Sequence, residues 1–218
     1  MPRQFDLLIF DWDGTLMDST AAIAGSIRKA CADLDLPVPT QEEASHIIGL
    51  GLTNAIAALL PELPPDEYSR LIARYRYHFL RQDGLLTLFD GVADAIPHLN
   101  KVGHTVTVAT GKNRAGLERA LDTSRLRPYF HATRCADESL SKPHPAMILE
   151  LMEAFGVPPQ RTLMIGDTSH DLLMAQNAGV ASVGAGYGAH DKESLRYFSP
   201  LYIADDFAGL SQWLTIHA

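Results

Sequence analysis

Residues 7–15 read LLIFDWDGT, a short apolar run that ends in two aspartates and a glycine. The run has the character of a buried strand, and the Asp-Gly pair indicates the turn that ends it. Asp11 and Asp13 are so close that ionising both is favourable only beside a cation or with a proton shared between them. A divalent metal site is therefore the first hypothesis. These residues alone leave a plain strand and turn equally open.

The composition is that of a globular protein. The chain has 218 residues, of which 46% are hydrophobic and 20% are charged, enough for one large domain or for a core with a smaller insert. The net charge of −8 argues against a surface for nucleic acid or anionic membrane. No signal-peptide pattern or membrane-length apolar stretch is present, so we expect a cytoplasmic protein. Cys31 and Cys135 are expected to be buried or incidental thiols.

The second half of the chain alternates between short apolar runs and helix-like segments. Expected strands cover residues 105–110, 130–135, 162–166, 181–184 and 201–204. Expected helices cover residues 92–102, 114–124, 145–155, 169–178 and 207–216, and glycines suit the position after several of them. Such alternation predicts an α/β fold, a Rossmann-like doubly wound parallel sheet with helices on both faces.

Residues 18–88 interrupt this alternation. Helical spacing covers residues 21–34, 40–48, 53–60 and 66–80, with prolines between them and no convincing strand. We therefore expect an all-helical inserted domain over residues 18–88. The α/β core would then consist of residues 1–17 and 89–218.

Four groups of polar residues follow separate predicted strands. They are Asp11 with Asp13, Thr110, Lys142, and Asp167 with Asp171. Ligands of open α/β sheets bind outside the carboxyl ends of the strands, where these groups would converge. Each group alone has an ordinary explanation as a helix cap or a solvated lysine. Their convergence favours the metal hypothesis.

The motifs resemble those of the haloacid dehalogenase-like hydrolase superfamily, and in particular its phosphoglycolate phosphatase-like members with a small helical cap. The matching motifs are DxDGT at residues 11–15, Thr110, Lys142-Pro143 and GDxxxD at residues 166–171. The resemblance covers essentially the whole chain, including the insert as the cap domain. It implies a Mg²⁺-dependent phosphatase that hydrolyses a small phosphorylated metabolite through an aspartyl-phosphate.

The resemblance also implies roles for the four carboxylates. Asp11 would be the nucleophile, and Asp13 the general acid and then the general base. Mg²⁺ would be bound by Asp11, the backbone carbonyl of Asp13 and Asp167, and Asp171 would bind behind them or orient a metal-bound water.

Further residues would bind the substrate or support the site. Thr110, Gly111 and Lys142 would contact the phosphoryl oxygens. The cap loop with Gly49, Leu50 and Gly51 would reach over the site and contact the leaving group. Supporting roles are expected for four other features, namely packing for Trp12, a helix cap for Asn113, a solvent-facing position for His170 and a loop near the site for residues 184–188.

Three other functions stay open. A β-phosphoglucomutase-like phosphomutase would return the phosphoryl group to another hydroxyl. A haloacid dehalogenase works without metal, so Asp13 and Asp167 would be superfluous. A non-catalytic binding domain is disfavoured by the intact set of polar residues. A phosphonate hydrolase would need a cap lysine near residues 49–52, where none occurs. The physiological ester stays open, as does the choice between monomer and homodimer.

Overall fold

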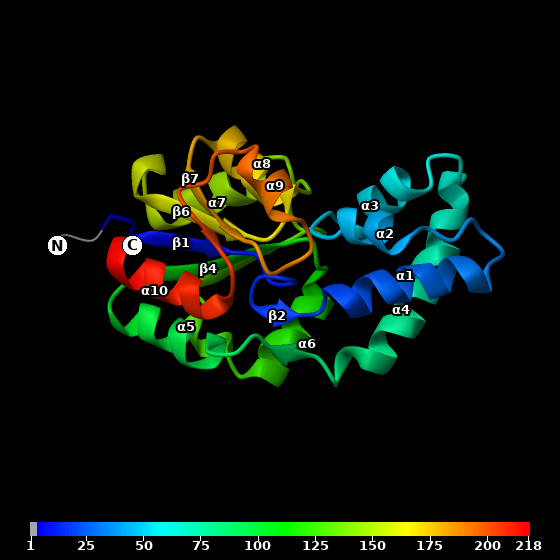
Figure 1. Cartoon of the computed structure of the whole chain (residues 1–218), viewed down its shortest axis with the longest axis horizontal. Helices are drawn as coiled ribbons and strands as arrows, with labels where there is room; N and C mark the ends of the chain where they lie inside the picture. Colours follow the sequence, from blue (N-terminus) through cyan, green and yellow to red (C-terminus); the bar gives the residue numbers. More distant parts are fainter. Residues whose placement is uncertain (1–3) are drawn as a thin grey trace.

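The structure is a computed structural model that describes residues 4–218. Its centre is a six-stranded parallel sheet with the order β5-β4-β1-β6-β7-β8 (Figure 1). The strands are β1 (Leu7–Phe10), β4 (Thr105–Thr110), β5 (Ala132–Cys135), β6 (Thr162–Gly166), β7 (Ala181–Ala185) and β8 (Ile203–Ala204). The chain winds outward from β1 first to β5 and then, on the other side, to β8. This confirms the predicted doubly wound sheet and places the switch point between β1 and β6.

Helices cover both faces of the sheet, as predicted (Figure 1). One face carries α7 (Ala146–Phe155) and α8 (Ser169–Ala178), and the other carries α5 (Val92–Lys101), α6 (Arg114–Ser124) and α10 (Phe207–His217). Successive side chains of a strand point to opposite faces. In β1, Leu8 and Phe10 therefore join the cluster under α5, α6 and α10, whereas Leu7 and Ile9 join the cluster under α7 and α8. The short helix α9 (Lys192–Arg196) follows β7.

Four helices lie beyond the carboxyl ends of the strands, at the right of Figure 1. They are α1 (Thr20–Asp33), α2 (Gln41–His46), α3 (Leu52–Leu59) and α4 (Tyr68–Asp83). They share an apolar core of their own, with Ile27, Ile56 and Leu71 almost fully buried. This is the predicted helical insert, which we call the cap. Its division from the core at residues 18 and 88 stays a prediction.

The prediction that residues 18–88 contain no strand is wrong at both ends. Strand β2 (Met17–Asp18) pairs antiparallel with β3 (Thr87–Leu88). Because each strand has only two residues, no alternation of apolar and polar side chains can reveal it. The pairing holds side by side the two points at which the chain leaves and re-enters the core.

Two further sequence expectations concern the membrane and the cysteines. None of the helices within residues 4–218 combines the length and the hydropathy needed to cross a bilayer. Cys31 and Cys135 are free and buried, as predicted.

Candidate active site

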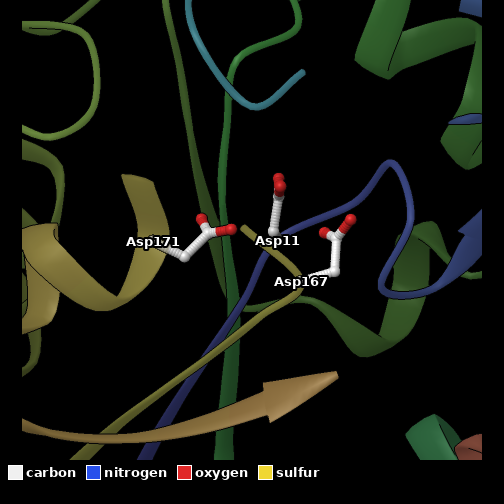
Figure 2. Close-up of side chains that lie close together, drawn as sticks. All are labelled: Asp11, Asp167 and Asp171. Carbon is white, nitrogen blue, oxygen red and sulfur yellow. The ribbon is translucent and has the colours of Figure 1, made fainter. Parts of the chain in front are cut away.

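The carboxylates of Asp11, Asp167 and Asp171 meet at the switch point of the sheet. Asp11 directly follows β1, Asp167 directly follows β6, and Asp171 lies in the first turn of α8. All three are almost fully buried, and one ligand oxygen of each lies within 4.8 Å of the others. Figure 2 shows the three side chains pointing toward one another from these elements. The predicted acidic residues are thus brought together.

Asp11 has one oxygen in use and one without a partner. Its Oδ1 accepts a hydrogen bond from the Trp12 backbone N–H at 2.6 Å and lies 2.9 Å from Lys142 Nζ. Its Oδ2 is buried and has no hydrogen-bond partner among residues 4–218. Burial raises the pKa of Asp11 to about 7, although the charge of Lys142 acts in the opposite direction. A buried oxygen without a partner needs a ligand, a cation or a proton.

Lys142 lies fully buried between two carboxylates. Its Nζ is 2.9 Å from Asp11 Oδ1 and 2.6 Å from Asp171 Oδ1. Burial by itself lowers the pKa of Lys142, but the charges of the two aspartates outweigh that effect and raise it. Lys142 is therefore a fixed positive charge beside Asp11, rather than the solvated lysine of the alternative interpretation.

Asp171 combines its contact with Lys142 with a structural role. Its Oδ2 accepts hydrogen bonds from the backbone N–H and the hydroxyl of Thr168, at 3.1 and 2.7 Å. Together the two residues form the capping box of α8. The cap interpretation and the site interpretation of Asp171 therefore both hold.

Asp167 is held by two donors and accommodated by two glycines. Its Oδ1 accepts from the Thr15 hydroxyl at 2.9 Å, and its Oδ2 accepts from the Ala189 backbone N–H at 2.7 Å. A Cβ atom at Gly14 or at Gly188 would overlap the Asp167 side chain. Gly14 also has a φ of +78°, which favours glycine. Burial raises the pKa of Asp167 well above its usual range, and the charges of Asp11 and Asp171 add to this shift.

This donor set fits a divalent cation. Three buried carboxylates face a single buried ammonium, and one carboxylate oxygen has no partner. A cation beside these carboxylates would offset the excess negative charge of the cluster. Because the ligand atoms of this cluster are carboxylate oxygens, a hard ion is favoured.

Asp13 does not join this cluster through its side chain. Its Oδ1 accepts a hydrogen bond from the Ser19 hydroxyl at 2.6 Å and lies 2.9 Å from Lys112 Nζ. The same ammonium lies 5.0 Å from the centre of the Phe79 ring on α4. The sequence predictions included neither Ser19 nor Lys112, although Lys112 follows Thr110-Gly111 at the end of β4. That Asp13 binds the metal only through its backbone carbonyl stays a prediction.

Thr110 and Gly111 end β4 beside the carboxylates. Thr110 is buried, and its hydroxyl oxygen accepts from the Lys112 backbone N–H at 3.2 Å, which leaves its own O–H available to donate. A Cβ atom at Gly111 would lie 2.6 Å from the carbonyl oxygens of both Gly49 and Leu50. The absence of a side chain at Gly111 therefore allows the cap loop to lie directly on the core.

The loop of residues 49–51 contacts three turns of the core, including the one at Gly111. The Gly51 N–H donates to Ser141 Oγ at 2.8 Å, next to Lys142. Gly49, with a φ of +93°, packs on Thr168 so tightly that a Cβ atom would lie 2.9 Å from its hydroxyl. The predicted cap loop does reach the site, and its contact with a leaving group stays a prediction.

The prediction that His170 faces solvent is wrong, because its side chain is half-buried. Its ring packs against those of His46 and His190, with centroids 5.8 and 5.3 Å apart. The Nε2 atoms of His170 and His190 lie 2.9 and 3.1 Å from the carbonyl oxygen of His46, at the end of cap helix α2. Local sequence could not show this contact because His46 lies more than a hundred residues away from both partners.

The other supporting residues are placed as predicted. Trp12 is fully buried and packs near Phe130, with ring centroids 6.0 Å apart. The Asn113 side chain caps α6 by accepting from the Gly116 N–H at 3.0 Å. The loop of residues 184–188 lies against the site, where the Tyr187 hydroxyl donates to the Thr15 carbonyl at 2.9 Å.

A cavity of about 470 Å³ separates the cap from the core. Core residues Asp11, Asp13, Thr110 and Lys112 line one end, and the remaining walls come mainly from the cap. Asp11 and Asp13 therefore face a cavity between the core and the cap that is partly open to solvent.

Comparisons with known proteins agree with this arrangement. A profile of the haloacid dehalogenase-like hydrolase family matches residues 8–185. The chain is 35% identical over 208 residues to the probable phosphatase IndB of Dickeya dadantii, which covers 93% of this chain and 90% of that protein. It is 32% identical over 211 residues to a phosphoglycolate phosphatase of Agrobacterium fabrum, which covers 94% and 90% respectively. A hydrolase structure from Pseudomonas syringae superposes with a TM-score of 0.89 at 23% identity, over 97% of this chain and 99% of that one, which supports the fold.

Proposed function

Because the chain belongs to the haloacid dehalogenase-like hydrolase family and is an enzyme of the phosphatase type, we propose that it hydrolyses small-molecule phosphate monoesters. The hydrolysis depends on Mg²⁺ and passes through an aspartyl-phosphate. The observation that carries the proposal is the free Oδ2 of buried Asp11, beside Lys142 and two further carboxylates. The substrate is a small phosphorylated metabolite, and phosphoglycolate is one candidate because a relative carries that name.

The first step transfers the phosphoryl group to the protein. Oδ2 of Asp11 attacks phosphorus, and the bond between phosphorus and the leaving oxygen breaks. The Asp13 side chain gives a proton to the leaving alkoxide, so an alcohol departs. Lys142 and the hydroxyl of Thr110 stabilise the negative charge on the phosphoryl oxygens.

The second step restores the enzyme. Asp13, now ionised, takes a proton from a water molecule as its oxygen attacks phosphorus. The bond between phosphorus and Asp11 Oδ2 breaks, which releases inorganic phosphate and returns the carboxylate. Ser19 and Lys112 both contact Oδ1 of Asp13, so they orient the carboxyl group in both steps.

Mg²⁺ would be held by Asp11, Asp167 and the backbone carbonyl of Asp13, with Asp171 behind them. The ion supplies positive charge that reduces repulsion between the Asp11 carboxylate and the phosphate dianion. Lys142 alone offsets only one of the three buried negative charges.

The proposal is tested by phosphate release from a panel of phosphate esters and pyrophosphate. The panel contains phosphoglycolate, nucleoside monophosphates, sugar phosphates and pyrophosphate, each with Mg²⁺ and with EDTA. We expect Mg²⁺-dependent release by the wild type and none by Asp11→Asn, since the amide is not a nucleophile. Asp94→Asn makes the same change at an exposed position of α5 and should keep full activity.

Three results would contradict the proposal. A folded wild type that is inert toward the whole panel would indicate a non-catalytic binding domain. Full activity in EDTA would exclude the metal requirement. Consumption of an ester without phosphate release would indicate a phosphomutase.

A further inference from the structure

The cavity above the reactive carboxylates has apolar walls. Its cap side is formed by side chains of α1, the loop after α2, α3 and α4. The apolar and aromatic side chains of this cap side include Ile27, Ile48, Ile56, Ile72, Tyr75 and Phe79. A leaving group attached to a phosphoryl group at Asp11 must extend toward these walls, because the core encloses the other side.

Helix α4 presents an aromatic surface to this cavity. Tyr75 and Phe79 are four residues apart and so share a helix face. Their rings stack with centroids 5.8 Å apart and an interplanar angle of 20°. Phe79 lies against the ammonium of Lys112, which contacts Asp13. The aromatic surface therefore begins directly beside the residue that protonates the leaving oxygen.

No buried cation in the described part of the cavity is free to bind a second anionic group. Lys112 is largely buried and pairs with Asp13 at 2.9 Å, whereas Arg119 is exposed and pairs with Asp83 at 3.1 Å. The third lining cation, Arg76, is exposed to solvent. A carboxylate or second phosphate on the leaving group would thus meet no buried, unpaired cation among the described lining residues, and the apolar walls would remove part of its hydration.

The cavity is also larger than a leaving group as small as glycolate requires. At about 30 Å³ per water molecule, 470 Å³ corresponds to about sixteen waters. Pockets that enclose larger organic ligands have volumes of about 300–1,000 Å³. The cavity thus has room for a leaving group of several carbons besides the phosphoryl group.

We propose that the preferred substrates are phosphate monoesters of uncharged, largely apolar alcohols of about six or more carbons, and that Phe79 and Tyr75 determine this preference. This inference rests on the proposed function and specifies its substrate class. Burial of the alkyl or aryl group against the cap would provide binding free energy at a distance from the reacting phosphorus.

The test uses a series of alkyl phosphates, namely ethyl, butyl and hexyl phosphate, with phosphoglycolate as the anionic competitor. The chemistry at phosphorus stays nearly constant in the series because the leaving alcohols are similar in basicity. Each buried methylene contributes up to about 0.8 kcal/mol, or about fourfold in kcat/KM. We expect kcat/KM to rise at least about tenfold from ethyl to hexyl phosphate and hexyl phosphate to exceed phosphoglycolate.

Variants of α4 distinguish an effect of the cavity wall from an effect of the helix as a whole. Phe79→Ala removes part of the apolar wall and should lower the hexyl-to-ethyl ratio at least about threefold, while Phe79→Leu should retain most of it. Tyr77→Ala removes an aromatic ring from the same helix, but this ring is 48% exposed and does not line the cavity. Its hexyl-to-ethyl ratio should equal that of the wild type. Thermal melting verifies that each variant is folded.

A binding measurement distinguishes this inference from the proposed function. Calorimetric titration of Asp11→Asn with the same alkyl phosphates should give a Kd that falls with chain length, whether or not the wild type turns over. Chain-length-dependent binding without any turnover would refute the phosphatase and support the apolar site. Turnover with a kcat/KM that does not change with chain length, or that is highest for phosphoglycolate, would refute the apolar site. The phosphatase proposal would then still hold. Absence of both binding and turnover would refute both.

Discussion

At the scale of single residues, Asp11 and Asp13 differ more than their spacing indicates. Asp11 is enclosed with Lys142 and two other carboxylates, and one of its oxygens is free. Asp13 instead contacts Ser19 and Lys112 beneath the cap. Similar carboxyl groups two positions apart thus occupy different electrostatic environments. This difference favours Asp11 as the nucleophile and Asp13 as the residue that transfers protons in the proposed reaction.

Replacement of Lys112 tests whether the ammonium orients Asp13. Lys112→Met keeps an unbranched side chain against Phe79 but removes the charge. We predict a decrease in kcat of about tenfold, within the range that general acid–base catalysis contributes, and a smaller change in KM. Steady-state kinetics measure both. The matched change Lys101→Met, at an exposed position of α5, should have no effect. An unchanged kcat in a folded Lys112→Met would show that the ion pair plays no part in turnover.

At the scale of elements, the site is completed where one loop of the cap lies against three turns of the core. The loop of residues 49–51 follows α2 in the cap and lies on the turns after β4, before α7 and before α8. The His46 carbonyl adds contacts with His170 and His190 on the core. The cap therefore lies over the carboxylates in this structure, a position from which a cap can limit the access of water to the site.

A methyl group at Gly111 should prevent this close approach. The Cβ of Gly111→Ala would lie 2.6 Å from two carbonyl oxygens of the cap loop, and a backbone cannot yield as a side chain can. We predict a decrease in kcat/KM of at least about tenfold, since small misplacements of this kind cost up to about a hundredfold. Gly25→Ala is the control, because no atom lies within 4 Å of the added Cβ in α1. Equal activities of the two variants would contradict the importance of cap closure.

At the scale of the whole molecule, the sheet and the acidic cluster could be predicted, whereas contacts between distant segments could not. Apolar runs and glycine stops indicated the strands and helices of the core, and motifs such as Asp11 and Asp167 marked strand ends. The pairing of β2 with β3 was missed because each strand is too short to show a pattern. Lys112 was missed because its partner, Asp13, lies on another strand end. The cavity was missed because it arises where three cap helices and the cap loop pack over the core.

The buried carboxylates predict how pH and Mg²⁺ together affect stability. Burial raises the pKa of Asp11 from 3.8 to about 7 in the metal-free protein. Between pH 4 and pH 7, about the window of that shift, the folded state therefore retains a proton that the unfolded state releases, and the free energy of unfolding falls as pH rises. The lowered pKa values of His170 and His190 act in the opposite direction over part of this range, so the test compares the wild type with Asp11→Asn. We predict that in EDTA the wild type loses more stability than Asp11→Asn between pH 5 and pH 7.5.

Mg²⁺ should reverse this loss because it binds the ionised carboxylates of the folded state. Thermal melting with Mg²⁺ and with EDTA should show a larger stabilisation at pH 7.5 than at pH 5. Asp11→Asn should weaken both the pH dependence and the response to Mg²⁺. A Mg²⁺ stabilisation that is the same at both pH values would argue against ion binding at this cluster.

The most direct test of the central claim is the mass of the Asp11 peptide after an acid quench within one turnover. In the wild type mixed with Mg²⁺ and a hydrolysable phosphate ester, we predict one added phosphoryl group on Asp11. The addition should be absent in EDTA and in Asp11→Asn. Phosphate release at the full rate with no phosphoryl group on the protein, or with the group on another residue, would contradict the role of Asp11 as nucleophile.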